Sequence, residues 1–142
     1  GQHSIDIVHG DIKPSNIIVD STGDAKFIDY GAAIFIEDSR KYMETDWTHG
    51  TVGYRAPEED KNNLLGKCSD IYSLGVTIVE LWCGNIWYSG EDFGQCRNEV
   101  LNALRKIEQG EPEIGKTLRK CLNMNGSKRP KIEKLKETFN QF

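Results

Sequence analysis

The 142-residue sequence lacks the features of several large classes of protein. Its longest apolar run, LGVTIVELWC, is about half as long as a bilayer span requires, and no charged segment followed by an apolar core opens the chain. We therefore expect no membrane span and no secretory signal. Lys and Arg number 18 against 22 Asp and Glu and form no basic stripe, so a nucleic-acid partner is not expected either.

Cysteine is present, but not in a pattern that indicates a metal site or a disulfide framework. The four residues contain no CxxC pair and have no histidines at zinc-ligand spacing; they are Cys68, Cys83, Cys96 and Cys121. Buried, reduced thiols are the favoured interpretation, which predicts an intracellular (cytoplasmic or nuclear) location. Internal repeats are also absent, and the length suits one globular body.

The first half of the sequence predicts little regular structure. Two short strands, IIVD and AKFID within residues 17–30, are joined by the turn-forming residues STGD and should form a hairpin. Residues 32–55 show no periodicity and are expected to form a long functional loop.

The second half predicts helices. An apolar helix capped by Ser69 or Asp70 should run through IYSLGVTIVELWC, stop at Gly84 and lie at the centre of the body. Apolar residues at spacings of three and four predict further helices at 98–110, 114–124 and 131–142. Pro130 should open the last of them.

A cluster of polar residues lies in the stretch HGDIKPSN. Asp11, Lys13 and Asn16 fit neither one helix face nor one strand face, so a shaped loop must bring them together. An aspartate can accept a proton from an attacking hydroxyl, a lysine can neutralise phosphoryl charge, and an asparagine oxygen can bind magnesium. Asp29, at the end of the predicted hairpin, is a natural second magnesium ligand.

These residues resemble the eukaryotic-type protein kinase family. HGDIKPSN at 9–16 is similar to its catalytic loop, His-Arg-Asp-Leu-Lys-Pro-x-Asn, with Lys-Pro typical of the serine/threonine branch, and Asp29-Tyr30-Gly31 resembles its Asp-Phe-Gly magnesium motif. GTVGYRAPE at 50–58 resembles the segment ending in Ala-Pro-Glu. DIYSLGV, which starts at Asp70, resembles the start of the family's central helix. Arg129 in SKRP resembles the arginine that pairs with the glutamate of Ala-Pro-Glu. Elements in this order and spacing do not arise by chance.

The resemblance implies a mainly α fold, the C-terminal lobe of a kinase, in which a helical bundle carries a small β-hairpin. Residues 1–142 would form a partial kinase domain. Its parts would be a catalytic loop at 9–16, a magnesium loop at 29–31, an activation segment at 29–58 and a helical subdomain at 69–142.

The resemblance also implies roles for individual residues. Asp11 would be the catalytic base and Lys13 would steady the transferred phosphoryl group. Asn16 and Asp29 would bind magnesium and nucleotide, and Ile18 would pack beneath the adenine.

Other residues would support the site. Asp70 would accept hydrogen bonds from the catalytic-loop backbone, and Glu58 would form a buried ion pair with Arg129. Thr51 would brace Asp11 and Lys13, although a simple loop hydroxyl is the alternative. His9 would be a packed core residue.

Gly10 departs from the family pattern, because most members have an arginine there that contacts a phosphate on the activation loop. Glycine has no side chain for that contact, so phosphorylation of this loop would lose its usual receiver. Candidate phosphate acceptors nevertheless exist in the loop: Ser39, Tyr42, Thr45 and Thr48.

The sequence contains no glycine-rich phosphate loop, and it begins with Gly1. We therefore expect a fragment, inactive alone, of a serine/threonine kinase that uses ATP and Mg²⁺ to phosphorylate a protein substrate when joined to its N-terminal lobe. The alternative is a non-catalytic, kinase-derived binding or decoy lobe (a pseudokinase) that docks on a partner kinase. Retention of Asp11, Lys13, Asn16 and Asp29 favours the first hypothesis.

Overall fold

The computed structural model describes residues 5–27, 33–37, 41–45, 51–84 and 92–140. This part of the chain is mainly helical, as the sequence predicted. Its α-helices are α1 (Pro57–Asn62), α2 (Lys67–Cys83), α3 (Phe93–Gly110), α4 (Pro112–Cys121) and α5 (Ile132–Phe139). There are also two single 3-10 turns in the described residues: η1 (Pro14–Asn16) lies between the first two strands, and η3 (Gly126–Lys128) lies between α4 and α5.

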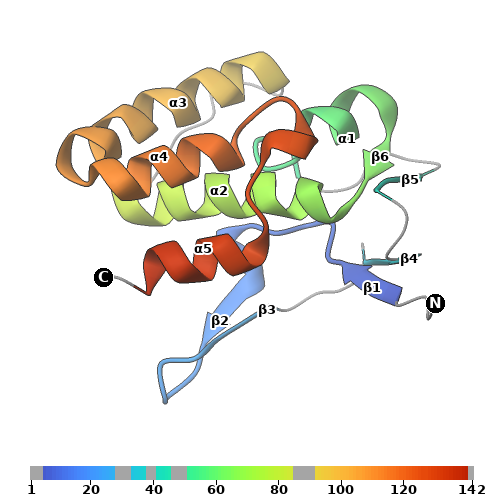
Figure 1. The fold of residues 1–142 in the computed structure, drawn as a ribbon, viewed down its shortest axis with the longest axis horizontal. Coiled ribbons are helices and arrows are strands. Elements are labelled where there is room, and N and C mark those ends of the chain that lie inside the picture. Colours follow the sequence, from blue (N-terminus) through green and yellow to red (C-terminus); the bar gives the residue numbers. More distant parts are fainter. Residues whose placement is uncertain (1–4, 28–32, 38–40, 46–50, 85–91, 141–142) are drawn as a thin grey trace.

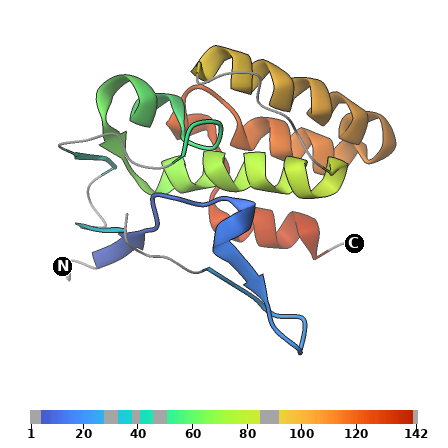
Figure 2. The same cartoon turned by 180° about the vertical axis from the view of Figure 1, so that it is seen from behind.

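Helix α2 is the centre of the molecule. Figure 1 shows α3 and α4 on one side of it, and the view from behind in Figure 2 shows the loop after the first strand running along its other side. The core between α2, α3 and α4 is apolar; its fully buried members include Val76, Val79, Leu104, Ile114 and Leu118. Gly75 allows α2 and α4 to approach closely, because a Cβ there would lie 2.8 Å from Cys121 Cβ.

The predicted helix boundaries are only partly right. The central helix begins at Lys67 with Gly66 as its N-cap, so neither Ser69 nor Asp70 is the N-cap residue. Ser69 lies in the first turn, where its Oγ accepts the backbone N–H of Gly66 at 3.1 Å. Asp70 does not cap the helix because its carboxylate binds backbone N–H groups of a distant loop. Pro130 was also misplaced, since α5 begins after it with Lys131 as the N-cap.

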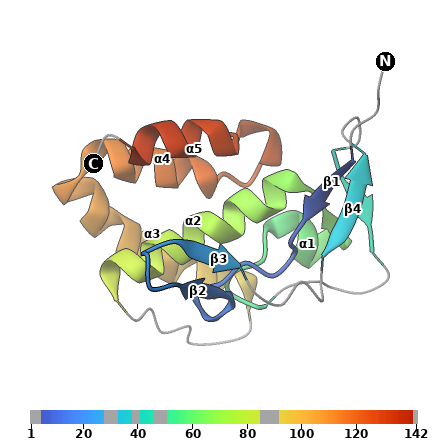
Figure 3. The ribbon, with the colours of Figure 1, turned by 90° about the horizontal axis from the view of Figure 1, so that it is seen from below.

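The strands form small two-stranded sheets. β2 (Ile17–Val19) and β3 (Ala25–Phe27) pair antiparallel, with Ile18 opposite Lys26, which confirms the predicted hairpin. The described part of 32–55 contains short strands that its lack of periodicity did not predict. It contains β4 (Ile34–Glu37), which pairs with β1 (Ile5–Val8), and β5 (Met43–Glu44), which pairs with β6 (Leu64–Leu65). Figure 3 shows β1 and β4 side by side.

The cysteines are free thiols, but they are not uniformly buried. Cys96 and Cys121 are buried, Cys68 is half-buried and Cys83 is exposed at the end of α2, so the expectation of buried thiols was wrong for Cys83. Among the residues described, no helix has the length and apolar character needed to span a bilayer.

Candidate active site

The loop from His9 to Asn16 is held against the first turn of α2. The backbone N–H of His9 donates to Asp70 Oδ2 at 2.7 Å, and that of Gly10 donates to Asp70 Oδ1 at 3.0 Å. Burial raises the pKa of Asp70, and the two hydrogen bonds oppose that rise. Asp70 therefore holds the backbone of the 9–16 loop, and the hydrogen bonds predicted for it are present.

Gly10 has a backbone reason to be glycine. Its φ of 82° lies in the left-handed region, which residues with a Cβ enter only at a cost. The neighbouring His9 is buried with 5% exposure, as expected for a packed residue, and its Nδ1 accepts the backbone N–H of Asp11 at 3.1 Å. These contacts fix the backbone on both sides of Gly10.

Asp11, Thr51 and Lys13 are in direct contact. The Thr51 hydroxyl donates to Asp11 Oδ1 at 2.8 Å and accepts a hydrogen bond from Lys13 Nζ, also at 2.8 Å. Lys13 Nζ lies 3.7 Å from Asp11 Oδ2. Thr51 is thus a bridge between the two charged groups rather than a simple loop hydroxyl. Both charged side chains remain partly accessible, with 19% exposure for Asp11 and 25% for Lys13.

Asn16 closes the loop on the other side of Asp11. Its Nδ2 donates to the backbone oxygen of Asp11 at 2.8 Å and to Asp11 Oδ2 at 3.2 Å. Because the nitrogen faces Asp11, the amide oxygen is directed to the other side of the group. Amide oxygens are suitable ligands for magnesium, so the residue present fits the expected metal.

Other residues named from the sequence lie outside the described residues or on the hairpin. Asp29, with Tyr30 and Gly31, lies outside the described residues, as do Ser39 and Thr48. Ile18 lies on β2 and is 51% exposed, so about half of this apolar side chain is accessible on the hairpin.

Two of the hydroxyl residues named as candidate phosphate acceptors, Tyr42 and Thr45, lie among the described residues, and both hydroxyls make hydrogen bonds. The Tyr42 hydroxyl accepts a hydrogen bond from Cys68 Sγ at 3.4 Å, and burial raises the pKa of Tyr42. The Thr45 hydroxyl donates to the backbone oxygen of Asn63 at 2.9 Å. These hydroxyls therefore help to pack the segment against the helical part.

Glu58 and Arg129 form the expected buried ion pair. Arg129 Nη1 and Nη2 donate to the two carboxylate oxygens of Glu58, each at 2.8 Å. The Arg129 side chain is 0% exposed, and Ser69 adds a hydrogen bond to Glu58 at 2.7 Å. Burial alone would raise the pKa of Glu58, but the hydrogen bonds and charge of Arg129 outweigh it and hold the pKa below its usual value.

Comparison with known proteins agrees with this geometry. The family model described as the protein kinase domain matches residues 2–139. The chain belongs to the protein kinase family. Its resemblance to the serine/threonine branch is supported by the relatives described next.

Three relatives illustrate how far the similarity of this kinase chain extends. It is 42% identical over 110 residues to serine/threonine-protein kinase PrkC of Bacillus subtilis, covering 78% of this chain and 16% of the relative. It is 30% identical to a probable receptor-like serine/threonine-protein kinase of Arabidopsis thaliana, and the match covers 89% of this chain and 33% of that relative. CBL-interacting serine/threonine-protein kinase 20 of the same plant is 32% identical, and the match covers 95% of this chain and 31% of that relative. The chain thus spans a third or less of these proteins.

Sequence reasoning missed several buried polar residues of this kinase domain. Ser69 and Ser73, on one face of α2, bond to the segment that ends in Ala-Pro-Glu. Glu59 lies one residue after that motif, is 2% exposed, and accepts the backbone N–H of Ala56 at 2.9 Å through Oε1. A helical spacing of four between the serines was the available signal, but small hydroxyl residues at that spacing are common in any helix.

Glu59 should make the stability of the kinase domain depend on pH. Burial raises its pKa to about 8, and its Oε2 is buried with no hydrogen-bond partner among the described residues. The folded state then holds a proton that the unfolded state loses above the ordinary pKa of 4.5. Stability from this group is fully present below pH 4.5 and is lost as the pH rises towards 8.

Replacing Glu59 by glutamine is expected to remove that dependence. In urea unfolding of the 142-residue chain at several pH values, the slope of unfolding free energy against pH should differ between wild type and Glu59→Gln by up to about 1.4 kcal/mol per pH unit. Parallel curves for the two proteins between pH 5 and 8 would show that Glu59 is ionised in the folded state.

Proposed function

We propose that these residues carry the catalytic groups of a serine/threonine protein kinase, which transfers the γ-phosphoryl group of ATP to a hydroxyl group of a protein substrate. The observation that supports this most directly is the contact of Asp11 and Lys13 through the Thr51 hydroxyl. These residues come from two segments about 40 residues apart, and α2 holds both.

Asp11 is the general base in this proposal. It accepts the proton of the substrate hydroxyl while that oxygen forms a bond to the γ-phosphorus. The bond between the γ-phosphorus and the bridging oxygen breaks, and ADP leaves with the electron pair. Lys13 offsets negative charge on the group in transfer, and Thr51 holds both side chains at a fixed separation.

Nucleotide and metal binding fall to other residues. Asn16 and Asp29 would hold magnesium, which would neutralise phosphate charge when bound. Ile18 offers its exposed side chain to the adenine. The remaining phosphate contacts would come from an N-terminal lobe, because the sequence holds no glycine-rich loop. Free thiols are consistent with an intracellular location.

Labelled ATP tests this function. When residues 1–142 are joined to a kinase N-terminal lobe, we expect phosphoserine or phosphothreonine on protein substrates, and removal of magnesium should abolish transfer. The 142 residues alone should transfer nothing and bind ATP more weakly than the micromolar range, because they supply only part of the phosphate contacts.

Two outcomes would overturn the proposal. Micromolar ATP affinity of the isolated chain in calorimetry would contradict the need for a second lobe. A joined chain that binds ATP and a partner kinase but transfers no phosphate would favour the decoy hypothesis.

A further inference from the structure

The Thr51 bridge is itself held by a turn. The backbone N–H groups of Tyr54 and Arg55 both donate to the backbone oxygen of Thr51, at 3.0 and 3.2 Å. This turn sets the direction of the Thr51 side chain towards Asp11. Any group that fixes the turn therefore fixes the bridge between the two charged residues of the site.

Ser73 binds the back of this turn from α2. Its hydroxyl donates to the backbone oxygen of Tyr54 at 2.7 Å. The same hydroxyl lies 3.3 Å from the backbone oxygen of Ser69 in its own helix, but a hydroxyl has one proton and the shorter contact is the stronger. Ser73 is 5% exposed, so water cannot readily replace the contact.

The position of Ser73 in α2 connects it to the catalytic loop. Asp70 lies one helical turn earlier and holds the backbone of His9 and Gly10. One rigid helix thus carries a carboxylate for the loop of Asp11 and a hydroxyl for the turn of Thr51. The single helical turn between Asp70 and Ser73 therefore fixes the separation of these two segments.

We propose that Ser73 is a positioning residue for phosphoryl transfer, because its hydrogen bond to Tyr54 sets the turn that places the Thr51 hydroxyl between Asp11 and Lys13. This inference rests on the proposed function only for its catalytic consequence. The structural part, that Ser73 fixes the turn, is testable without any activity.

Thr77 provides a matched control. It lies one turn further along the same face of α2 and is 0% exposed, but its hydroxyl donates to the backbone oxygen of Ser73 at 2.8 Å, within the helix. Thr77→Val removes a buried hydroxyl of α2 at nearly constant volume without touching the turn. Any effect shared by both variants is therefore a general effect of losing a buried hydroxyl.

Amide hydrogen exchange of the 142-residue chain tests the structural part. In Ser73→Ala the amides of Tyr54 and Arg55 should exchange about fivefold to tenfold faster, while those of His9 and Gly10 stay unchanged. Ser73→Cys keeps the side-chain volume with a much weaker donor and should give the same result. Ser73→Thr should restore the wild-type exchange rates of Tyr54 and Arg55. Thr77→Val should leave the exchange rates of both pairs of amides unchanged from wild type.

Kinetics of the chain joined to an N-terminal lobe tests the catalytic part. Ser73→Ala should lower kcat about tenfold, equivalent to about 1.4 kcal/mol, with the KM for ATP unchanged and kcat rescued in Ser73→Thr. Unchanged exchange at Tyr54 and Arg55 in Ser73→Ala, or the same change in Thr77→Val, would overturn the inference. A wild-type chain without activity would overturn the proposed function, and exchange would still decide the role of Ser73.

Discussion

Asp11→Asn is expected to lower kcat for phosphoryl transfer about a thousandfold in the chain joined to an N-terminal lobe, with ATP affinity close to normal. A positioned general base contributes roughly a hundredfold to ten-thousandfold. Asparagine keeps the size of the side chain but cannot take the substrate proton. Its oxygen can still accept the Thr51 hydroxyl, which lies 2.8 Å from Asp11 Oδ1. The substitution removes the 3.2 Å acceptor of Asn16 Nδ2, but the shorter bond of that nitrogen to the backbone oxygen of residue 11, at 2.8 Å, stays, so the loop should keep its shape.

The comparison needs two further aspartate variants. Asp24→Asn changes an exposed aspartate of the hairpin turn, whose Oδ2 lies 3.2 Å from the Thr22 hydroxyl, and should leave kcat unchanged. Asp29→Asn should weaken magnesium and nucleotide binding instead of chiefly lowering turnover. An equal loss of ATP affinity in Asp11→Asn and Asp29→Asn, measured by calorimetry, would contradict the separate roles proposed for them.

The ion pair of Glu58 and Arg129 is expected to give the largest single effects on stability. Glu58→Ala and Arg129→Ala should each destabilise the chain by about 3 to 5 kcal/mol, because each leaves a buried partner without its counter-charge. Arg129 also donates to the backbone oxygens of Cys68 and Asn123, so its loss should be the more damaging. The double variant should cost much less than the sum.

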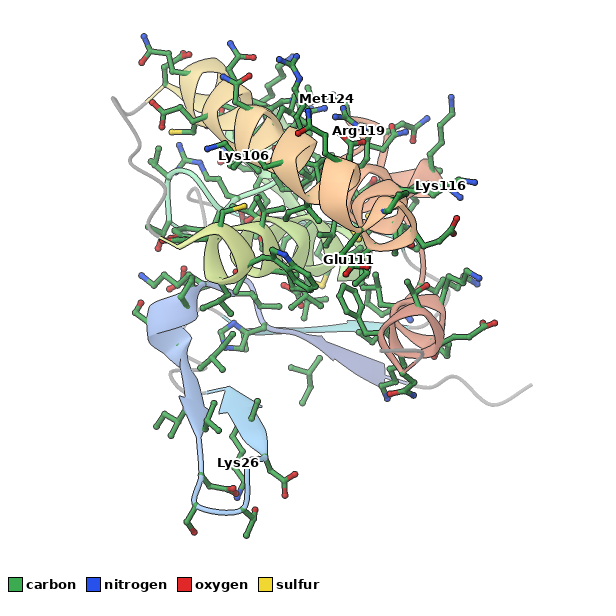
Figure 4. The ribbon with its side chains drawn as sticks, turned by 90° about the vertical axis from the view of Figure 1, so that its left-hand side faces the viewer. Lys26, Lys106, Glu111, Lys116, Arg119 and Met124 are labelled. Carbon is green, nitrogen blue, oxygen red and sulfur yellow. The ribbon has the colours of Figure 1, made fainter. Side chains whose placement is uncertain are left out.

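An exposed pair on the same molecule supplies the control. Arg119 of α4 donates to both carboxylate oxygens of Glu108 of α3 at 2.7 Å, a geometry like that of the buried pair. Arg119 is 46% exposed and Glu108 29%, and the pair should contribute about 1 kcal/mol or less because water screens it. Figure 4 shows Arg119 with Lys106 and Lys116 on α3 and α4, at the end of the molecule opposite the hairpin that carries Lys26.

Urea unfolding of the chain measures the free energy of unfolding for the single and double variants of the buried pair and of the exposed control pair. If Glu58→Ala leaves too little folded protein, Glu58→Gln keeps the volume and one acceptor and should lie between wild type and alanine. Additive losses at Glu58 and Arg129 would show that the two residues act separately in the folded state, despite the contact between them.

The sequence predicted best where one local pattern carries the whole signal. The apolar residues of α2 occur nearly all round the helix, and this alone placed the helix at the centre of the core. The turn residues STGD, between two short β-branched runs, likewise predicted the hairpin of β2 and β3. In both cases the residues that interact are close in the sequence.

Prediction failed where pairing is long-range. β1 pairs with β4, with Val8 opposite Ile34, and β5 pairs with β6, with Met43 opposite Leu65. Two to four residues are too few for a period-two pattern to stand out, so 32–55 was predicted to be a loop. The helix cap was misassigned for a related reason, because the carboxylate of Asp70 is used by His9 and Gly10 some 60 residues away.

The sequence by itself determined the family and the identity of the charged groups, because the motif around Asp11, Lys13 and Asn16 keeps the family's order and spacing. Only the tertiary structure decided how these groups are held. The Thr51 bridge and the Ser73 contact join residues 38 and 19 positions away in the chain, and side-chain hydrogen bonds of that kind leave no periodic signal. They form only because α2 presents Asp70 and Ser73 to two different segments at fixed spacing.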